Sequence, residues 1–120
     1  MKKKIVVVDD EQGIRLLLQE ILETYDYDVI TAKTGKEVFE ILEVDTFDLL
    51  IIDYKLPGMD GAEVLKKIEQ EGTFSKPVIM MSGLVENIDD RIKNIPFVKG
   101  ILAKPFQIDE FIKLIQSILG

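Results

Sequence analysis

The chain has 120 residues, a formal net charge of −7, and neither cysteine nor histidine. The length suits one domain with its own core, and the composition, 47% hydrophobic and 31% charged, is that of a globular protein. The missing residue types exclude disulfides, thiol or histidine catalysis and most transition-metal sites. The acidic charge argues against non-specific binding to nucleic acid.

The basic start of the chain, Met1-Lys2-Lys3-Lys4, is followed by an apolar run of only residues 5–8. That run is too short for the apolar core of a signal peptide. No segment reaches the roughly 20 apolar residues of a transmembrane helix. We therefore expect a cytoplasmic protein that does not enter a membrane.

Short apolar runs alternate with amphipathic stretches along the whole chain. The runs predict five strands, at residues 5–8, 27–31, 48–53, 77–82 and 98–103. Apolar residues at helical spacing predict five helices. The first predicted helix has Ile14, Leu17, Leu18, Ile21 and Leu22 on one face. The second follows Thr34-Gly35, and the third begins at Asp60-Gly61. The fourth, a weak helix, covers residues 85–93, and the fifth covers residues 108–119.

This alternation predicts a (βα)₅ domain over residues 1–120, with a parallel sheet covered by helices on both faces. The common open solution for five such units is the flavodoxin-like strand order 2-1-3-4-5. In that order, ligands bind beyond the carboxyl ends of strands 1 and 3. The residues that end these two strands are therefore the first candidates for a functional site.

Acidic residues stand at both of these ends: Asp9 and Asp10 follow the first strand, and Asp53 ends the third. Carboxylates that converge in one crevice repel one another, and a hard divalent cation relieves the repulsion. Oxygen ligands alone favour Mg²⁺, although Mn²⁺ or Ca²⁺ would also fit. Taken singly, each aspartate could simply begin a helix or end a strand; the set of three favours a metal site.

Two further residues end strands that flank the same crevice, Ser82 after the fourth strand and Lys104 after the fifth. A phosphoryl group on Asp53 would gain a hydroxyl donor from Ser82 and a cation from Lys104. Alone, Ser82 would be read as a helix cap and Lys104 as a solvated charge. Aspartate is an established nucleophile for phosphoryl groups, and because this chain has no histidine, a phosphohistidine donor or acceptor must belong to a partner.

With these residues at these positions, the chain resembles the receiver domain of bacterial two-component response regulators over essentially its whole length. The residues that carry the resemblance are Val8-Asp9-Asp10, Asp53, Leu56-Pro57-Gly58-Met59-Asp60-Gly61, Ser82 and Lys104-Pro105-Phe106. The resemblance implies that Asp53 is phosphorylated and that Asp9, Asp10 and the backbone carbonyl of Lys55 hold Mg²⁺ with it. It also implies that Ser82 and Lys104 bind phosphoryl oxygens and that the Lys104–Pro105 bond is cis.

Within this family the chain looks most like single-domain receivers that act as intermediates in sporulation phosphorelays. That resemblance rests on Gly13-Ile14-Arg15, Lys55 and Ile108-Asp109-Glu110. It implies no output domain, a sensor histidine kinase as donor and a histidine phosphotransferase as acceptor. Many receivers carry a switch aromatic three residues before the lysine, where this chain has Ile101, which fits a carrier better. The alternative is a chemotaxis-type receiver that signals by phosphorylation-dependent protein binding.

We expect a docking patch for the histidine-bearing partner around the crevice. Its predicted members are Gln12, Ile14, Arg15, Leu18, Gly83, Leu84, Pro105 and Phe106. Ile14 and Leu18 lie one helical turn apart and would form an apolar stripe, unless both belong to the core. Arg15 is expected to be exposed in either case. Lys55 and Leu84 are expected to obstruct an attacking water, which predicts slow hydrolysis of the phosphorylated form.

Two other classes share parts of this pattern. A Mg²⁺-dependent phosphohydrolase would often carry a second acid two residues after its nucleophile, where this chain has Lys55. A flavin-binding module could use Thr31-Ala32-Lys33-Thr34-Gly35 as a phosphate loop, but this segment follows the second strand, and no glycine-rich nucleotide fingerprint is present. Both alternatives are therefore less favoured than the receiver.

Overall fold

The computed structural model describes residues 2–72, 74–83 and 88–120. Strands and helices alternate along the chain. Their bounds are β1 Lys4–Val8, α1 Gln12–Thr24, β2 Asp28–Ala32, α2 Gly35–Val44, β3 Leu49–Asp53, α3 Gly61–Glu71, β4 Val78–Ser82, α4 Asp90–Lys93, β5 Val98–Ala103 and α5 Ile108–Leu119.

The five strands form one parallel sheet in the order β2-β1-β3-β4-β5, as predicted. The predicted bounds of β5 and α5 are confirmed. Those of β1, β3 and β4 differ by one residue at one end, and β2 is shifted by one residue along the chain. The weak helix predicted at residues 85–93 appears as the short α4, and the first part of that prediction lies outside the described residues. No helix of the described chain is long and apolar enough to cross a membrane.

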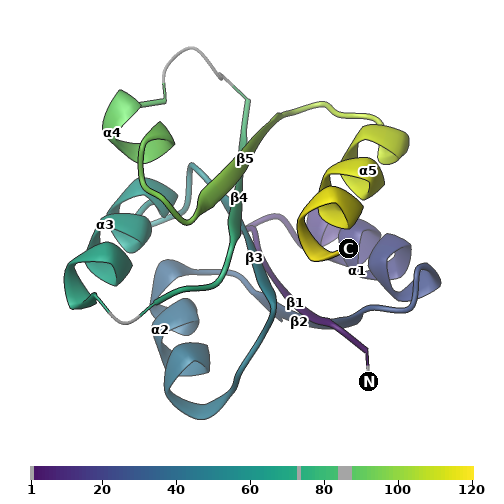
Figure 1. Ribbon diagram of the computed structural model, residues 1–120, viewed down its shortest axis with the longest axis horizontal. Helices are drawn as coiled ribbons and strands as arrows, with labels where there is room; N and C mark the ends of the chain where they lie inside the picture. Colours follow the sequence, from purple (N-terminus) through teal and green to yellow (C-terminus); the bar gives the residue numbers. More distant parts are fainter. Residues whose placement is uncertain (1, 73, 84–87) are drawn as a thin grey trace.

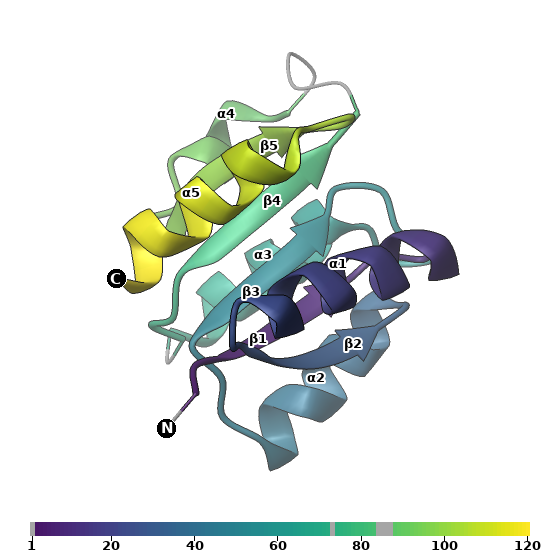
Figure 2. The ribbon, with the colours of Figure 1, turned by 90° about the vertical axis from the view of Figure 1, so that its right-hand side faces the viewer.

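Helices cover both faces of the sheet, with α1 and α5 on one side and α2, α3 and α4 on the other (Figure 1, Figure 2). Side chains that alternate along a strand point to opposite faces. In β1, Ile5 and Val7 therefore pack with α1 and α5, whereas Val6 and Val8 pack with the other three helices. Because the central strands are buried on both faces, they consist almost entirely of apolar residues.

The loop from β3 to α3 lies close against the end of β3. The amide of Gly61 donates to the carbonyl of Tyr54 at 2.8 Å. A Cβ atom at Gly61 would overlap the carbonyl oxygen of Asp53 and lie 3.1 Å from the Cα of Tyr54. Helix α3 then starts with Asp60 as its cap, whose Oδ1 accepts from the amide of Glu63 at 2.9 Å. Glycine at this position thus allows the loop to fold back over the carboxyl end of the sheet.

Candidate functional site

Three acidic side chains meet at the carboxyl ends of β1 and β3. One carboxylate oxygen from each of Asp9, Asp10 and Asp53 lies within 4.8 Å of the other two. The sheet register explains the convergence, because Val8 pairs with Ile52 and the next residues on both strands are acidic. Asp9 is 0% exposed and Asp53 is 7% exposed, whereas Asp10 is open to solvent. The predicted grouping of the three carboxylates is confirmed.

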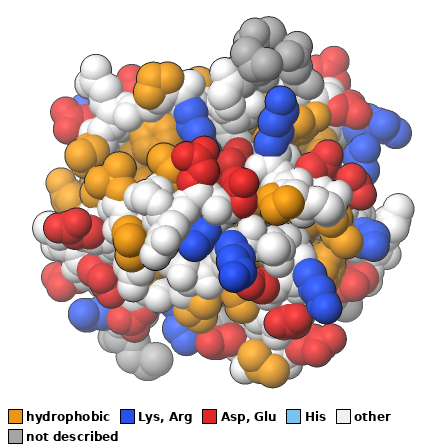
Figure 3. Space-filling model, turned by 180° about the vertical axis from the view of Figure 1, so that it is seen from behind, with side chains coloured by type: hydrophobic (Ala, Val, Ile, Leu, Met, Phe, Trp, Pro, Cys, Tyr) orange, Lys and Arg blue, Asp and Glu red, His pale blue; other side chains and the backbone are white. Residues whose placement is uncertain are grey.

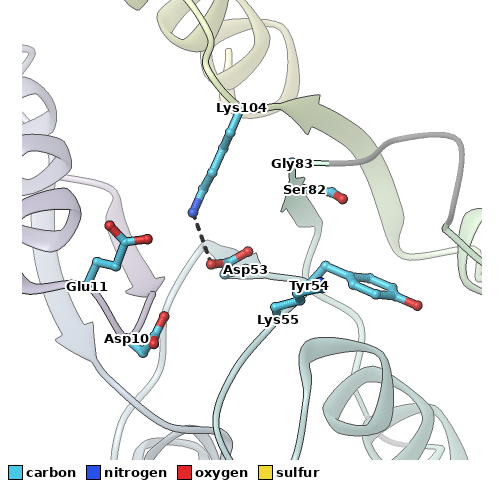
Figure 4. A pocket seen from close by; sticks show the side chains of 8 residues that line it. All are labelled: Asp10, Glu11, Asp53, Tyr54, Lys55, Ser82, Gly83 and Lys104. Carbon is cyan, nitrogen blue, oxygen red and sulfur yellow. Dashed lines mark hydrogen bonds and ion pairs between the residues drawn. The ribbon is translucent and has the colours of Figure 1, made fainter.

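Lys104 brings a positive charge into this acidic group. Its backbone amide donates to the carbonyl of Ser82 at 2.8 Å, which fixes the end of β5 beside the end of β4. Its Nζ donates to Asp9 Oδ2 at 2.7 Å and to Asp53 Oδ2 at 3.0 Å. In Figure 4 the lysine reaches across the site towards Asp53, with Ser82 on the opposite side from Asp10. The peptide bond that follows, Lys104–Pro105, is cis as predicted.

Two opposing effects act on the ionisation of Asp53 and Lys104: burial disfavours their charged forms, and their mutual attraction favours them. Burial raises the pKa of Asp53 above its ordinary value, although the hydrogen bond from Lys104 opposes this effect. Burial acts to lower the pKa of Lys104, but its bonds to Asp9 and Asp53 outweigh burial and leave that pKa raised. The Lys104 ammonium therefore stays charged, and the Asp53 carboxyl keeps its proton to a higher pH than an exposed aspartate does.

Asp9 is held by four hydrogen bonds, one of which runs from its backbone amide to the carbonyl of Ala32 at 3.1 Å. Besides the bond from Lys104, its Oδ1 accepts from the amide of Glu11 at 2.9 Å. Its backbone carbonyl accepts from Nη1 of Arg15 at 2.7 Å. Arg15 was expected to be exposed, but it is only partly exposed because its guanidinium folds back onto the β1–α1 turn. This contact links residues on a strand end and a helix, so it could not be inferred from helical spacing.

A pocket of about 410 Å³ opens above these groups. Its lining consists of Asp10, Glu11, Asp53, Tyr54, Lys55, Ser82, Gly83 and Lys104. Sequence reasoning missed Glu11 and Tyr54, although both are direct neighbours of the acidic motifs. In Figure 4 the Glu11 carboxylate faces the space between Lys104 and Asp10, while the hydroxyl of Tyr54 points away from Asp53. The pocket therefore offers carboxylates on one side and hydroxyl and ammonium groups around Asp53.

The donor set fits a hard divalent cation. Three carboxylate oxygens within 4.8 Å can be bridged by one Mg²⁺ whose remaining positions are filled by water or phosphoryl oxygens. The Lys104 ammonium that binds two of these carboxylates indicates that this group attracts cations. Lys55 lines the same pocket, and the role predicted for its backbone carbonyl stays a prediction.

A second depression, of about 340 Å³, lies beside the pocket. Its lining consists of Ile14, Leu17, Leu18, Lys104, Pro105 and Phe106. Hydrophobic side chains gather on this side of the molecule, where α1 and α5 lie (Figure 3). We call this depression the α1–α5 groove. Because Lys104 borders both the groove and the pocket, the two are adjacent.

The α1–α5 groove changes the predicted docking patch at two positions. Leu18 is 1% exposed and packs in the core with α5, so it forms the floor of the groove and offers almost no surface. Leu17, which was placed on the apolar face of this helix but not in the predicted patch, is 49% exposed and lines the groove. Gln12 and Gly83 are exposed, and Leu84 lies outside the described residues.

Comparison with known proteins assigns this architecture to a family. The family model described as the response regulator receiver domain matches residues 5–116. The chain belongs to this family. It is thus a receiver domain of a two-component system, a class that is phosphorylated on an aspartate and typically binds Mg²⁺.

The proteins that this receiver domain resembles carry names that describe different roles. It is 38% identical over 119 residues to the alkaline phosphatase synthesis transcriptional regulatory protein PhoP of Bacillus subtilis, covering 99% of the chain but 49% of that relative. It is 36% identical over 111 residues to sporulation initiation phosphotransferase F of the same organism, covering 92% of the chain and 88% of that relative. The solved structure of chemotaxis protein CheY4 of Vibrio cholerae is 27% identical, with a TM-score of 0.89 over 99% of the chain and 100% of CheY4.

Proposed function

We propose that this receiver is a phosphorelay intermediate. Asp53 accepts a phosphoryl group from a phosphohistidine of a sensor kinase, in a Mg²⁺-dependent reaction, and passes it to a histidine phosphotransferase. We place this exchange in the cytoplasm and propose that the fold of residues 1–120 is sufficient for it. The observation that carries the proposal is the position of Asp53, whose Oδ2 lies 3.0 Å from the Lys104 ammonium in the floor of an open acidic pocket.

The transfer itself is an in-line displacement. An oxygen of Asp53 forms a bond to phosphorus while the bond between phosphorus and the partner's ring nitrogen breaks. The electron pair of that bond goes to the ring nitrogen, and a proton on the other ring nitrogen makes the imidazole a neutral leaving group. The product is an acyl phosphate on Asp53, and the reverse displacement by a second partner's imidazole returns it to histidine. No water is consumed in either step.

The residues around Asp53 have separate roles in this displacement. Lys104 is placed to neutralise charge on the phosphoryl oxygens, and Ser82 to donate a hydrogen bond to one of them. Asp9, Asp10, Asp53 and the carbonyl of Lys55 would hold Mg²⁺. When bound, that ion supplies charge neutralisation and orients the phosphoryl oxygens. The transfer thus depends on positioning and charge more than on acid–base chemistry, which agrees with the absence of histidine from the chain.

The α1–α5 groove supports transfer to a protein partner. Leu17 is 49% exposed and lines the groove with Ile14 and Phe106, directly beside Lys104. An apolar surface at this distance from the reacting carboxylate suits a helical partner that must present an imidazole to Asp53. Gln12 and Arg15 would add polar contacts at the rim.

Two observations favour a carrier over a conformational signaller. Ile101 stands where many receivers carry a switch aromatic, and its side chain packs against the core. The chain therefore has no aromatic ring at this position that could move between a buried and an exposed state. The similarity to sporulation initiation phosphotransferase F extends over 88% of that protein. We therefore propose control of sporulation as the process, with CheY4-like signalling by protein binding as the alternative.

A role in transcriptional control is a second candidate. The chain spans about half the length of PhoP and of the Helicobacter pylori transcriptional regulatory protein CrdR, at 38% and 37% identity. A receiver of this kind would change its contacts after phosphorylation rather than pass the group on. The two candidates therefore differ in whether a histidine protein removes the phosphoryl group from Asp53.

The first test uses phosphoramidate as a small phosphohistidine analogue, with Mg²⁺, and intact mass as the readout. We expect one phosphoryl adduct on the wild type and none on Asp53→Asn. The phosphorylated chain is then mixed with a purified histidine phosphotransferase. Loss of the phosphoryl adduct from this chain, together with its appearance on the partner, supports the relay. An undiminished adduct on Asp53→Asn would overturn the assignment of Asp53, and label retained by this chain would favour signalling.

A further inference from the structure

Arg15 makes a contact that its expected place on a docking surface does not explain. It lies in the first turn of α1, yet its Nη1 donates to the backbone carbonyl of Asp9 at 2.7 Å. Its own amide donates to the carbonyl of Glu11 at 3.1 Å. One residue therefore contacts both ends of the turn that joins β1 to α1, and this turn carries Asp9 and Asp10.

The Asp9 carbonyl depends on this contact, although the Asp9 amide donates to the carbonyl of Ala32 at 3.1 Å and the Asp9 carboxylate accepts from Glu11 and Lys104. Glu11, the cap of α1, makes no side-chain capping bond, so the start of the helix lacks the usual support. Asp9 is 0% exposed, which leaves water little access to its carbonyl. A buried carbonyl that loses its donor costs free energy, and a bond from a charged guanidinium is stronger than a neutral one. Loss of Arg15 would therefore allow the turn to rearrange until the carbonyl finds another partner.

A rearranged turn would move the side chains that project from it. Asp9 Oδ1 accepts from the amide of Glu11 at 2.9 Å, so the carboxylate and backbone of this turn are held as one unit. An oxygen of Asp10 has to stay within 4.8 Å of those of Asp9 and Asp53 for the three to share one ion. Mg²⁺ is demanding about ligand geometry, and groups that orient metal ligands affect affinity strongly.

We propose that Arg15 is a positioning residue for the metal-ligand turn, and that its bond to the Asp9 carbonyl holds Asp9 and Asp10 where they can bind Mg²⁺. This inference rests on the proposed function. It assigns to Arg15 a role inside the protein, in the preorganisation of the acidic group, in place of a role only at the partner surface.

The charge of Arg15 makes the proposal sharply testable. If Arg15 acted only as a nearby positive charge, its removal would strengthen Mg²⁺ binding, because a cation beside an acidic group repels the metal. If it acts by positioning, its removal weakens binding. The two effects have opposite signs, so the direction of the change in Mg²⁺ affinity decides between them.

The experiment measures Mg²⁺ binding directly by isothermal titration calorimetry on wild type, Arg15→Ala and Arg15→Gln. We expect the dissociation constant to rise roughly tenfold in both variants. Lys113→Gln, which removes an exposed positive charge from α5, is the matched control and should leave affinity near the wild-type value. An unchanged or lower dissociation constant in the Arg15 variants would overturn the proposal.

Two further readouts separate positioning from a general loss of structure. With phosphoramidate as donor, the half-saturating Mg²⁺ concentration should rise in the Arg15 variants, while the maximal rate at saturating Mg²⁺ stays close to that of the wild type. In Mg²⁺-free buffer, the Glu11 amide should exchange its hydrogen faster in Arg15→Ala, with amides of the central strands unaffected. Slower exchange or no change at Glu11 would count against the proposal.

The outcomes distinguish this inference from the proposed function. If the wild type binds no Mg²⁺ and takes up no phosphoryl group, the proposed function fails. If the wild type does both and the Arg15 variants bind Mg²⁺ equally well, only the role of Arg15 fails.

Discussion

The ammonium of Lys104 lies 3.0 Å from the Asp53 carboxylate, across the sheet from β5 to β3. The same ammonium bonds to Asp9 at 2.7 Å, so one positive charge lies between two carboxylates and reduces the repulsion between them. Lys104 places this positive charge beside two of the carboxylates that would hold Mg²⁺, and from there it would also contact a phosphoryl group on Asp53. Metal binding and phosphoryl binding should therefore depend on Lys104 in opposite ways.

Replacing Lys104 with glutamine should separate these two effects. We expect tighter Mg²⁺ binding in Lys104→Gln, because a competing cation is removed. The rate of phosphorylation at saturating Mg²⁺ should fall by about 100-fold, the usual cost of losing one group that stabilises transition-state charge. Calorimetry and intact-mass time courses with phosphoramidate measure the two quantities. Lys99→Gln removes an exposed lysine from β5, the strand that Lys104 follows, and should change neither quantity. Weaker Mg²⁺ binding in Lys104→Gln would contradict the expectation.

Mg²⁺ affinity should depend on pH through Asp53. Burial raises the pKa of Asp53 above its ordinary value, opposed by Lys104, so this carboxyl keeps its proton to a higher pH than an exposed aspartate does. Mg²⁺ has to displace that proton. We therefore expect affinity to increase as pH rises through the raised pKa and then to level off. Calorimetric titrations across this range on wild type and Asp53→Asn provide the test, and identical pH profiles for the two proteins would refute it.

Asp53 should also lower the stability of the metal-free fold. Because its pKa is raised on folding, the ionised carboxylate is unfavourable at pH values above that pKa, and this cost disappears below the pKa of the unfolded chain. In EDTA at neutral pH, Asp53→Asn should melt a few degrees higher than the wild type. The difference should vanish in acid. Asp28→Asn, at an exposed position on β2, is the control, and a melting temperature of Asp53→Asn below that of the wild type would contradict the prediction.

Two adjacent leucines of α1 should have opposite phenotypes. Leu18 is 1% exposed and packs in the core, so Leu18→Ala should lose about 2–5 kcal/mol of unfolding free energy. Leu17 is 49% exposed in the α1–α5 groove, so Leu17→Ala should change stability by less than about 1 kcal/mol. It should instead slow transfer to a histidine phosphotransferase while phosphorylation by phosphoramidate stays normal. Urea unfolding and transfer assays measure these effects, and normal transfer in Leu17→Ala would argue against the groove as a docking site.

Two glycines should also respond differently to alanine. A Cβ at Gly61 would overlap the Asp53 carbonyl oxygen, so Gly61→Ala should lose about 1–3 kcal/mol of stability and slow phosphorylation by displacing Asp53. A Cβ at Gly13 meets no atom within 4 Å. Because Gly13 lies in α1, Gly13→Ala should gain about 0.5–1 kcal/mol. Thermal unfolding and intact-mass time courses suffice, and a Gly61→Ala protein of wild-type stability would show that the loop can move aside.

Much of the fold was predictable because its causes are local. Apolar runs such as the one ending at Asp53 identify strands, and Asp60-Gly61 marks the start of a helix. Strand order follows from general rules for parallel sheets, and that order places Asp9, Asp10 and Asp53 at neighbouring strand ends. The residues at the strand ends could be predicted as a group because the carboxyl ends of parallel strands all lie at the same edge of the sheet.

The tertiary structure decided which side of each residue meets solvent and which atoms touch. Helical spacing places Leu17 and Leu18 on one broad face, but only the packing of α1 against α5 determines that Leu18 is buried and Leu17 is not. The bond from Arg15 to the Asp9 carbonyl and the reach of Lys104 to two carboxylates depend on side-chain paths between different elements. Sequence periodicity predicts which face of its own helix or strand a side chain lies on. Contacts between side chains of different elements depend on how those elements are placed in space, which periodicity does not predict.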